Sequence, residues 1–259
     1  MSILERFRLD GKRAVVTGGS RGLGYAIAQA LAEAGADLVL VARDPENLQQ
    51  ARSQLLTTGR QVDVITGDLS SPDGTTAACQ TILETFPRID ILVNNVGGRR
   101  INIATEQLEL ADWQRILDLN LTSAFLCCKL VGGRMVERRH GCIINVASIC
   151  GIIVSRGIYG RAYETAKAAL LQFTRALAVD WAPYGVRVNA IAPGTFLTDA
   201  NRRWFREMPD LRSRIESQIP LGRLGEPSEI GAAAVYLASE ASSYMTGAVL
   251  VIDGGYTLW

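Results

Sequence analysis

VVTGGSRGLGYAIA, residues 15–28, leads from a β-branched run into an alanine-rich run through three glycines. The run 13–18 has the residues of a buried strand, and the segment 25–35 has those of a helix that ends at a glycine. The glycines Gly18, Gly22 and Gly24 lie in the turn between them. A strand followed directly by a helix begins a βαβ unit, so this stretch predicts an α/β fold.

The same alternation continues along the chain. Short apolar runs predict further strands at 37–42, 61–68, 89–95, 142–148, 186–192 and 248–253, with helices that include 45–59, 112–138 and 162–182. Strands this apolar on both faces are typical of a parallel sheet covered by helices on each side. Because no linker, repeat or low-complexity stretch interrupts the pattern, we expect a single Rossmann-type, doubly wound domain over residues 1–259.

The bulk composition excludes several classes of function. Hydrophobic residues make up 48% of the 259 and the formal net charge is +1, so nothing indicates a nucleic-acid or membrane partner. One histidine, His140, is too few for a histidine triad or a multi-histidine metal site, and we expect no metal. The five cysteines form no C-x-x-C pair, and the N-terminus resembles no signal peptide. We therefore expect a soluble, cytoplasmic protein with reduced thiols.

The glycines of the turn also indicate a binding site. Without side chains the turn can be tight, and its backbone can approach a pyrophosphate at the positive end of the following helix. The spacing is T-G-x-x-x-G-x-G, and three glycines alone would also fit an ordinary turn. Their place between the first strand and the first helix favours nucleotide binding.

Further motifs follow in order, and with the glycine turn they make the chain resemble the short-chain dehydrogenase/reductase family over nearly its full length. Val96 stands where the family usually has alanine, a change that should leave the backbone contact intact. The motifs are GDLS (67–70), VNNVG (93–97), Asn120 in LNLTS, Ser148, YETAK (163–167), VNAIAPG (188–194) and VIDGG (251–255).

The resemblance implies a nicotinamide dinucleotide cofactor and the residues that hold it. Asp68 and Leu69 would contact the adenine, and Asn95 and Gly97 the adenosine ribose region. The nicotinamide end would lie against residues 193–198. The full implied set is Gly18, Ser20, Arg21, Gly22, Leu23, Gly24, Arg43, Asp68, Leu69, Asn95, Gly97, Tyr163, Lys167, Pro193, Gly194 and Thr198.

The end of the second strand distinguishes the two nicotinamide dinucleotides. A carboxylate there would bind the ribose 2′-hydroxyl of NAD, whereas basic residues would accommodate the 2′-phosphate of NADP. Ala42 stands where an NAD-type family member carries the acid, Arg43 follows it, and Arg21 lies in the glycine turn. Two guanidinium groups around one phosphate favour NADP(H) over NAD(H). The alternative, which Asp44 keeps open, is that Arg43 is a solvated loop residue.

A tyrosine and a lysine are predicted to share one face of a helix. Tyr163 and Lys167 are four residues apart, and a nearby ammonium helps a phenol that titrates near ~10 to ionise. Carbonyl reduction needs such a proton donor. The resemblance makes Tyr163 the acid, with Ser148 on the substrate oxygen, and it gives Asn120 the support of a water chain to Lys167. Taken singly, each of these residues also fits a purely structural role.

A second tyrosine, Tyr159, has no lysine four residues later. We expect the helix to begin near Arg161 or Ala162, which leaves Tyr159 in the preceding loop, where it either lines the substrate pocket or covers the loop. Ser148 and Tyr163 are fifteen positions apart, more than is usual in the family. We expect the longer loop to reshape one wall of the pocket.

Arginines gather where the family binds its substrate. Arg99 and Arg100 follow NNVG, and five more lie near 198–217, a segment expected to form a small substrate lid. Arginine binds carboxylate or phosphate through paired hydrogen bonds, so one interpretation is an anionic substrate. The other is a solvated lid surface. The five are Arg202, Arg203, Arg206, Arg212 and Arg214.

The expected function is NADP(H)-dependent interconversion of a carbonyl and a secondary alcohol. NNVGGRR and NAIAPGTFLTDANRR resemble family members that act on sugar acids and related hydroxy compounds, which predicts a sugar acid, polyol or keto acid. The main alternative is reduction of 3-oxoacyl groups on an acyl carrier protein. A dinucleotide-binding sensor without turnover is disfavoured, because Asn120, Ser148, Tyr163 and Lys167 are all present.

Two helices also predict assembly. Residues 112–138 and 162–182 carry apolar stripes beyond what one sheet face needs, and the family commonly pairs such helices across a two-fold axis. We expect a homotetramer, with a dimer as the alternative.

Overall fold

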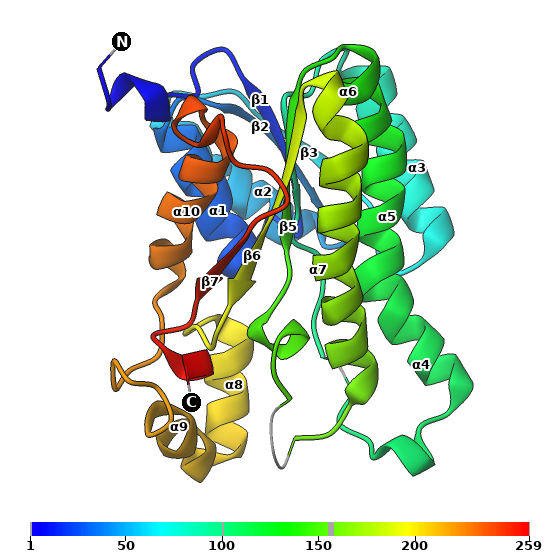
Figure 1. Cartoon of the computed structure of the whole chain (residues 1–259), viewed down its shortest axis with the longest axis vertical. Coiled ribbons are helices and arrows are strands. Elements are labelled where there is room, and N and C mark those ends of the chain that lie inside the picture. The colour runs from blue at the N-terminus through cyan, green and yellow to red at the C-terminus, as the bar shows by residue number, and fades with distance from the viewer. Residues whose placement is uncertain (1, 100, 155–157, 259) are drawn as a thin grey trace.

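Seven strands form one parallel sheet in the part of the chain that this computed structural model describes, residues 2–99, 101–154 and 158–258. Their order across the sheet is β3-β2-β1-β4-β5-β6-β7 (Figure 1). The predicted α/β class and all seven predicted strands are confirmed. The bounds are β1 Arg13–Thr17, β2 Asp37–Ala42, β3 Val62–Thr66, β4 Ile91–Asn94, β5 Gly141–Val146, β6 Val186–Pro193 and β7 Val249–Ile252.

The winding direction of the sheet reverses at β1. Ala14 pairs with Leu38 of β2 on one side and with Ile91 of β4 on the other, and both pairings are parallel. The chain therefore winds outward from β1 to β3 and then returns to β4 on the opposite side. Open α/β sheets bind ligands at the carboxyl ends of the strands next to such a reversal.

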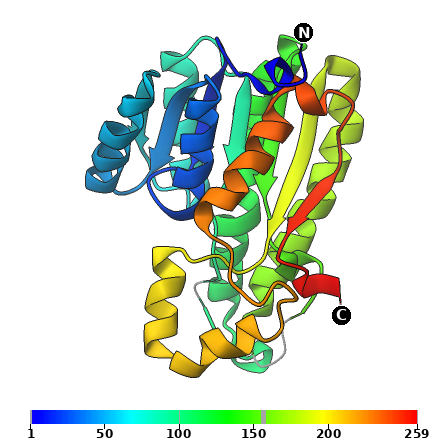
Figure 2. The same cartoon turned by 90° about the vertical axis from the view of Figure 1, so that its left-hand side faces the viewer.

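Helices cover both faces of the sheet (Figures 1 and 2). Val16 packs into the cluster under one helical layer, and its neighbour Val15 packs into the cluster under the other. Burial on both faces explains why the strands read as continuous apolar runs. One layer is α1 (Gly22–Glu33), α2 (Pro45–Leu55) and α10 (Gly231–Ala238), and the other includes α3 (Pro72–Thr85) and α7 (Arg161–Trp181).

The second layer also contains a long irregular helix over residues 110–137. Its pieces are α4 (Leu110–Leu117), α5 (Ser123–Cys127) and α6 (Gly133–Glu137), joined by two π-helical turns. Asn120 lies in the first π turn, and such turns are frequent at functional sites. Among the described residues this is the one helix long and apolar enough to cross a membrane, and 44% of the apolar window is buried inside the protein.

Two short helices project beyond the carboxyl edge of the sheet (Figure 2). They are α8 (Asp199–Glu207) and α9 (Pro209–Glu216), and they coincide with the predicted lid segment. Their apolar side chains join those of the following loop in a small cluster that is separate from the sheet core. The buried members of that cluster are Phe205, Leu211, Ile215, Ile219 and Leu224.

Candidate active site

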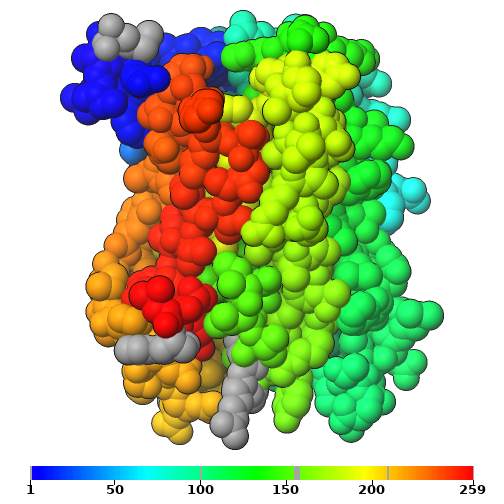
Figure 3. Space-filling model, viewed as in Figure 1, coloured from blue at the N-terminus to red at the C-terminus, as the bar shows by residue number. Residues whose placement is uncertain are grey.

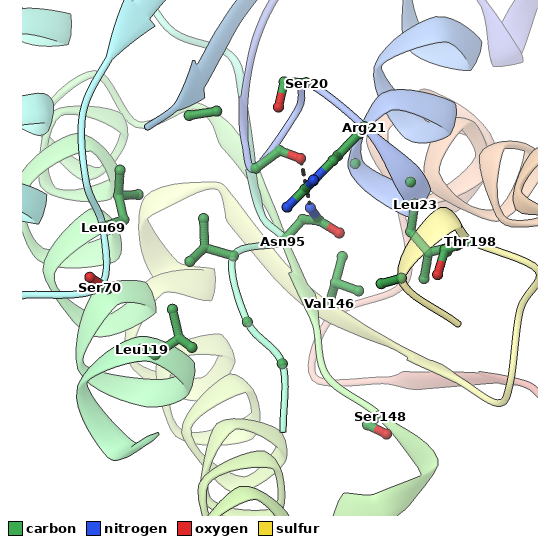
Figure 4. Close-up of a pocket in the computed structure, with 18 of the residues that line it drawn as sticks. Ser20, Arg21, Leu23, Leu69, Ser70, Asn95, Leu119, Val146, Ser148 and Thr198 are labelled. Carbon is green, nitrogen blue, oxygen red and sulfur yellow. Dashed lines mark hydrogen bonds between the residues drawn. The ribbon is translucent and has the colours of Figure 1, made fainter. Parts of the chain in front are cut away.

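A cavity of about 880 Å³ lies along the carboxyl ends of β1, β2, β4 and β5, next to the reversal at β1. Figure 4 shows Arg21 extending over it from the glycine turn, with Ser148 at the other end. All the residues predicted to hold the cofactor line this cavity, as do Ser148, Tyr163 and Lys167. Of the predicted site residues, only Asn120 is outside its lining.

The glycine turn packs too tightly to admit side chains. Gly18 has a positive φ of 65°, and a Cβ atom on Gly24 would lie 2.2 Å from the carbonyl oxygen of Gly18. Helix α1 begins at Gly22, and no side chain caps its N-terminus with a hydrogen bond. The free amides of its first turn, together with the positive end of the helix dipole, suit an anion such as pyrophosphate.

Asn95 joins this turn to the end of β4 through hydrogen bonds. Its Nδ2 donates to the carbonyl oxygens of Thr17, at 3.1 Å, and Gly18, at 3.3 Å. In return the Thr17 hydroxyl accepts the backbone N–H of Asn95 at 2.9 Å and donates to Val93. Thr17 was not among the predicted site residues, although it is the threonine of the T-G-x-x-x-G-x-G motif.

The end of β2 brings one basic and one acidic residue to the cavity. Ala42, Arg43 and Asp44 all line it, as does Arg21. However, Oδ1 of Asp44 accepts the backbone N–H groups of Glu46 and Asn47, both at 3.1 Å, and so caps α2. These backbone bonds, Asn47 first, hold the pKa of Asp44 below its usual value. The carboxylate of Asp44, the residue that kept open the interpretation of Arg43 as a solvated loop residue, is therefore engaged at the start of α2, and Arg43 itself is exposed.

Other predicted contacts on the cofactor side are arranged by local turns. Asp68 accepts the backbone N–H of Ser70 at 3.0 Å, which shapes the turn after β3. Thr198 caps α8 by accepting from Asn201, and its methyl group would be the nearest neighbour of a Cβ atom on Gly22. The glycine turn and the segment that leads into α8 therefore come together at Thr198. The sequence reasoning did not identify Arg115, Ile116, Leu119, Val146, Phe196 or residues 199–201, which also line the cavity.

Tyr163, Ser148 and Lys167 come together at one end of the cavity. Helix α7 begins at Arg161, as predicted, so Tyr163 and Lys167 lie one turn apart, with Nζ of Lys167 5.9 Å from the centre of the Tyr163 ring. Burial raises the pKa of Tyr163 to about 12, and a hydrogen bond with Ser148 opposes that rise. Burial lowers the pKa of Lys167 to about 8. In the protein alone, the phenol is therefore neutral at pH 7 and the lysine is mostly protonated.

Asn120 reaches this group indirectly. Its amide pairs with the backbone of Gly98, accepting the N–H at 2.8 Å and donating to the carbonyl oxygen at 3.1 Å. A Cβ atom on Gly97 would lie 2.8 Å from Oδ1 of Asn120 and 2.9 Å from Nζ of Lys167. The missing side chain at Gly97 thus allows Asn120 and Lys167 to approach each other.

The arginines predicted to meet an anionic substrate are arranged differently. All five lid arginines are exposed, and none of them lines the cavity. Three lie near glutamates, with Arg202 3.9 Å from Glu226 and Arg212 2.9 Å from Glu216. Of the two interpretations, the solvated lid surface is the one that the structure favours. Arg100 lies outside the described residues.

Tyr159 lies in the loop before α7, as predicted, and its side chain is 51% exposed. It is absent from the lining of the cavity, and its backbone N–H donates to Oδ1 of Asn102 at 2.7 Å. The surrounding residues 155–157 lie outside the described part of the chain. The geometry of Tyr159 itself favours a covering role over contact with the reacting groups.

Comparison with known proteins places these features in context. Residues 18–257 match the family model described as enoyl-(acyl carrier protein) reductase. The chain is similar to galactitol 2-dehydrogenase (L-tagatose-forming) from Cereibacter sphaeroides, with 42% identity over 254 residues and 98% of each chain covered. It is also similar to 3-oxoacyl-[acyl-carrier-protein] reductase from Chlamydia pneumoniae, with 40% identity over 249 residues, 96% of this chain and 98% of the relative.

A solved structure resembles the whole chain. It is a gluconate 5-dehydrogenase from Burkholderia cenocepacia J2315 in complex with NADP and tartrate. The two chains are 34% identical, each is covered to 100%, and the TM-score is 0.91. The fold and the order of the elements are therefore common to both proteins.

Proposed function

Because this chain belongs to the short-chain dehydrogenase/reductase family and is an oxidoreductase, we propose that it interconverts a secondary alcohol and a carbonyl group with NADP(H). One observation carries the proposal. A single cavity has an anion-binding glycine turn at one end and the group of Ser148, Tyr163 and Lys167 at the other. Such a cavity suits a dinucleotide beside a substrate that must exchange both a hydride and a proton.

The residues present fit a dinucleotide. A side chain at Gly24 would collide with the carbonyl oxygen of Gly18, so only glycine allows this close packing, and the start of α1 beside the cavity has no side-chain cap. Phosphate groups would lie there, and Lys167 would hold ribose hydroxyls at the other end of the molecule. Hydride exchange is the chemistry that a bound nicotinamide would supply.

The preference for NADP(H) rests on charge. Arg21, from the glycine turn, and Arg43, just after β2, both line the cavity, while the Asp44 carboxylate is engaged at the start of α2. Guanidinium groups suit a 2′-phosphate, and the carboxylate next to Arg43 already accepts backbone N–H groups of α2. The gluconate 5-dehydrogenase complex with NADP supports the same preference.

The proton is handled by side chains of this chain. In alcohol oxidation, Tyr163 as phenolate takes the hydroxyl proton, while Ser148 donates a hydrogen bond to the developing carbonyl oxygen. The ammonium of Lys167, buried beside the ring, stabilises the phenolate. Asn120 supports the arrangement by fixing Gly98, so that Gly97 stays against Lys167. In the reductive direction, Tyr163 returns the proton.

The substrate class that we propose is a polyol or a related sugar-derived hydroxy compound. The similarity to galactitol 2-dehydrogenase supports a polyol. The five arginines at 202–214 are exposed and do not line the cavity, which weakens the case for an acidic substrate. The second candidate is reduction of a 3-oxoacyl thioester, which is favoured by 40% identity to the reductase from Chlamydia pneumoniae.

We further propose a homotetramer in the cytoplasm, with a dimer as the alternative assembly. Figure 3 shows the edge segment that contains β7 side by side with α7 on one face of the molecule. Val251 of β7 and Val179 of α7 are exposed, and so is Phe125 of α5, which belongs to the same helical layer as α7. Exposed apolar side chains on regular elements suit contacts between identical subunits.

A substrate panel tests the proposed function. Galactitol, gluconate and the reduction of acetoacetyl-coenzyme A would each be assayed with both NADP(H) and NAD(H). We expect oxidation of the polyol with NADP+ as the better cofactor. Turnover of the thioester alone would favour the second candidate, and turnover of none of the three would contradict both.

A further inference from the structure

Arg99 lies between three segments at the catalytic end of the cavity. It follows β4, and its side chain is 18% exposed. Nη1 donates to the carbonyl oxygen of Tyr159 at 2.7 Å and to that of Gly160 at 3.3 Å. Nη2 is 3.4 Å from Oε1 of Glu164 and 3.6 Å from Sγ of Cys150. One guanidinium therefore joins the loop after β4, the turn after β5 and the start of α7.

The start of α7 depends on these contacts because it lacks the usual cap. Gly160, the residue before the helix, has a positive φ of 96° and no side chain to accept from the first turn. It also packs closely on the segment of Arg99, since a Cβ atom on Gly160 would lie 2.4 Å from the carbonyl oxygen of Ile101. Tyr163 is the third residue of α7. Its position is thus set by the part of the helix that Arg99 holds.

Glu164 makes the arrangement sensitive to charge. Its side chain is buried, and Oε1 is 2.8 Å from Arg161 and 3.4 Å from Arg99. Within the described residues, Oε2 is buried without a hydrogen-bond partner. A buried carboxylate requires nearby cations, and removal of Arg99 would leave Arg161 to compensate the charge of Glu164 with one arginine fewer.

The guanidinium also lies close to the phenol ring. The guanidinium carbon of Arg99 is 5.0 Å from the centre of the Tyr163 ring, and Nζ of Lys167 is 5.9 Å from the same point. The titratable and charged groups that face Tyr163 are Arg99, Lys167, Cys150 and Glu164. Burial raises the pKa of Tyr163 to about 12, Cys150 and Glu164 raise it further, and the hydrogen bond of Ser148 and the charge of Arg99 lower it.

We propose that Arg99 is a positioning residue for the reaction: it holds the start of α7 against the turn after β5 and places a second cation beside the Tyr163 phenol. Its contacts within the protein leave it little freedom to bind an anionic substrate, the role that the sequence suggested. The inference rests on the proposed function in one respect, since it assumes that Tyr163 is the acid–base group. Its structural half, the holding of α7, stands independently of turnover.

The kinetic test compares Arg99→Met, Arg99→Lys and the control Arg203→Met, an exposed lid variant. In alcohol oxidation, kcat/KM rises with pH as Tyr163 ionises. We expect Arg99→Met to raise the apparent pKa of that limb by about one unit. At pH values below the pKa, kcat/KM would then be about tenfold lower than in the unmodified enzyme. Arg99→Lys should restore the limb in part, because it keeps the cation, but not kcat, because one ammonium cannot make all four contacts. If Arg99→Met raises KM alone and leaves the limb in place, Arg99 binds substrate and the proposal is wrong.

A second measurement needs no substrate. We expect amide hydrogen exchange in residues 158–166 to be at least about tenfold faster in Arg99→Met than in Arg203→Met, because the start of α7 loses its anchor. Glu164→Gln, which keeps the shape of the side chain, should speed exchange in the same segment and serves if Arg99→Met does not fold. Unchanged exchange in both variants would refute the holding role. Failure of the substrate panel with altered exchange would instead count against the proposed function alone.

Discussion

Nζ of Lys167 donates a hydrogen bond of 2.9 Å to the backbone carbonyl oxygen of Val146. This bond joins α7 to the end of β5, and the lysine that makes it is only 2% exposed. Burial disfavours the charged form and lowers the pKa of Lys167 to about 8. The lysine that the proposed reaction needs charged is therefore held where charge reduces the stability of the fold.

The first prediction follows from the sign of that shift. Because the pKa of Lys167 in the folded protein is below its usual value of 10.5, the unfolded state binds more protons between about pH 8 and 10.5, and stability rises with pH across that window. Below about pH 8 the full penalty, about 3 kcal/mol, is present. Lys167→Met removes it and loses a hydrogen bond of about 1 kcal/mol, so we expect a gain of about 2 kcal/mol at pH 7. Urea unfolding at pH 7 and pH 10 measures the free energy of unfolding of both proteins. If the gain in Lys167→Met is as large at pH 10 as at pH 7, the buried charge of Lys167 is not its cause.

The second prediction separates the two tyrosines. Tyr163→Phe removes the proposed acid–base hydroxyl and should lower kcat by about a thousandfold, within the usual range for proton transfer. Tyr159→Phe removes the hydroxyl of an exposed loop residue and should leave kcat unchanged within about twofold. NADPH binding, followed by fluorescence, should persist in both variants. An equal loss of kcat in the two variants would contradict the assignment of the acid–base role to Tyr163 alone.

The third prediction concerns the cofactor. Arg43→Ala should lower kcat/KM for NADPH by about ten- to a hundredfold, the worth of one charge-assisted hydrogen bond, with little effect on NADH. Ala42→Asp should raise the activity with NADH by providing a carboxylate for the 2′-hydroxyl. The ratio of kcat/KM for the two cofactors measures both effects. A parallel loss with both cofactors would show that Arg43 does not read the 2′-phosphate.

The fourth prediction compares two glycines. In Gly97→Ala the new methyl group would stand 2.9 Å from Nζ of Lys167, so the ammonium must move, and we expect kcat to fall by at least about tenfold. Gly133→Ala, in α6, places its methyl group in open space and should stabilise the helix by about 0.5–1 kcal/mol without changing kcat. Kinetics and thermal unfolding of both variants provide the test. Equal kinetics in both would show that Lys167 tolerates displacement.

Much of the fold and part of the site could be predicted because they depend on local patterns. Val15 and Val16 face opposite helical layers, and that requirement appears in the sequence as an uninterrupted apolar run. Tyr163 and Lys167 lie one helical turn apart, so their association follows from spacing once the helix is recognised. The break of the long helix into π turns at Asn120 leaves no such local signal.

The direction in which individual charged side chains point could not be predicted from the sequence. Asp44 is next to Arg43 in the chain and lines the same cavity, yet its carboxylate caps α2, and this pairing depends on where the helix begins. The lid arginines cluster in the sequence near 198–217, but α8 and α9 bury their apolar sides and turn the charges to solvent. A charge count therefore suggested an anion site where the structure places a helix surface.

By itself the sequence determined the parallel sheet, the glycine turn and the pairing of Tyr163 with Lys167, because each depends on residues close together in the chain. Only the tertiary structure decided the partners of Arg99, which binds the carbonyl oxygen of Tyr159 sixty positions away. A long charged side chain takes the acceptors that folding brings within its reach, and those acceptors come from segments whose meeting depends on the whole sheet.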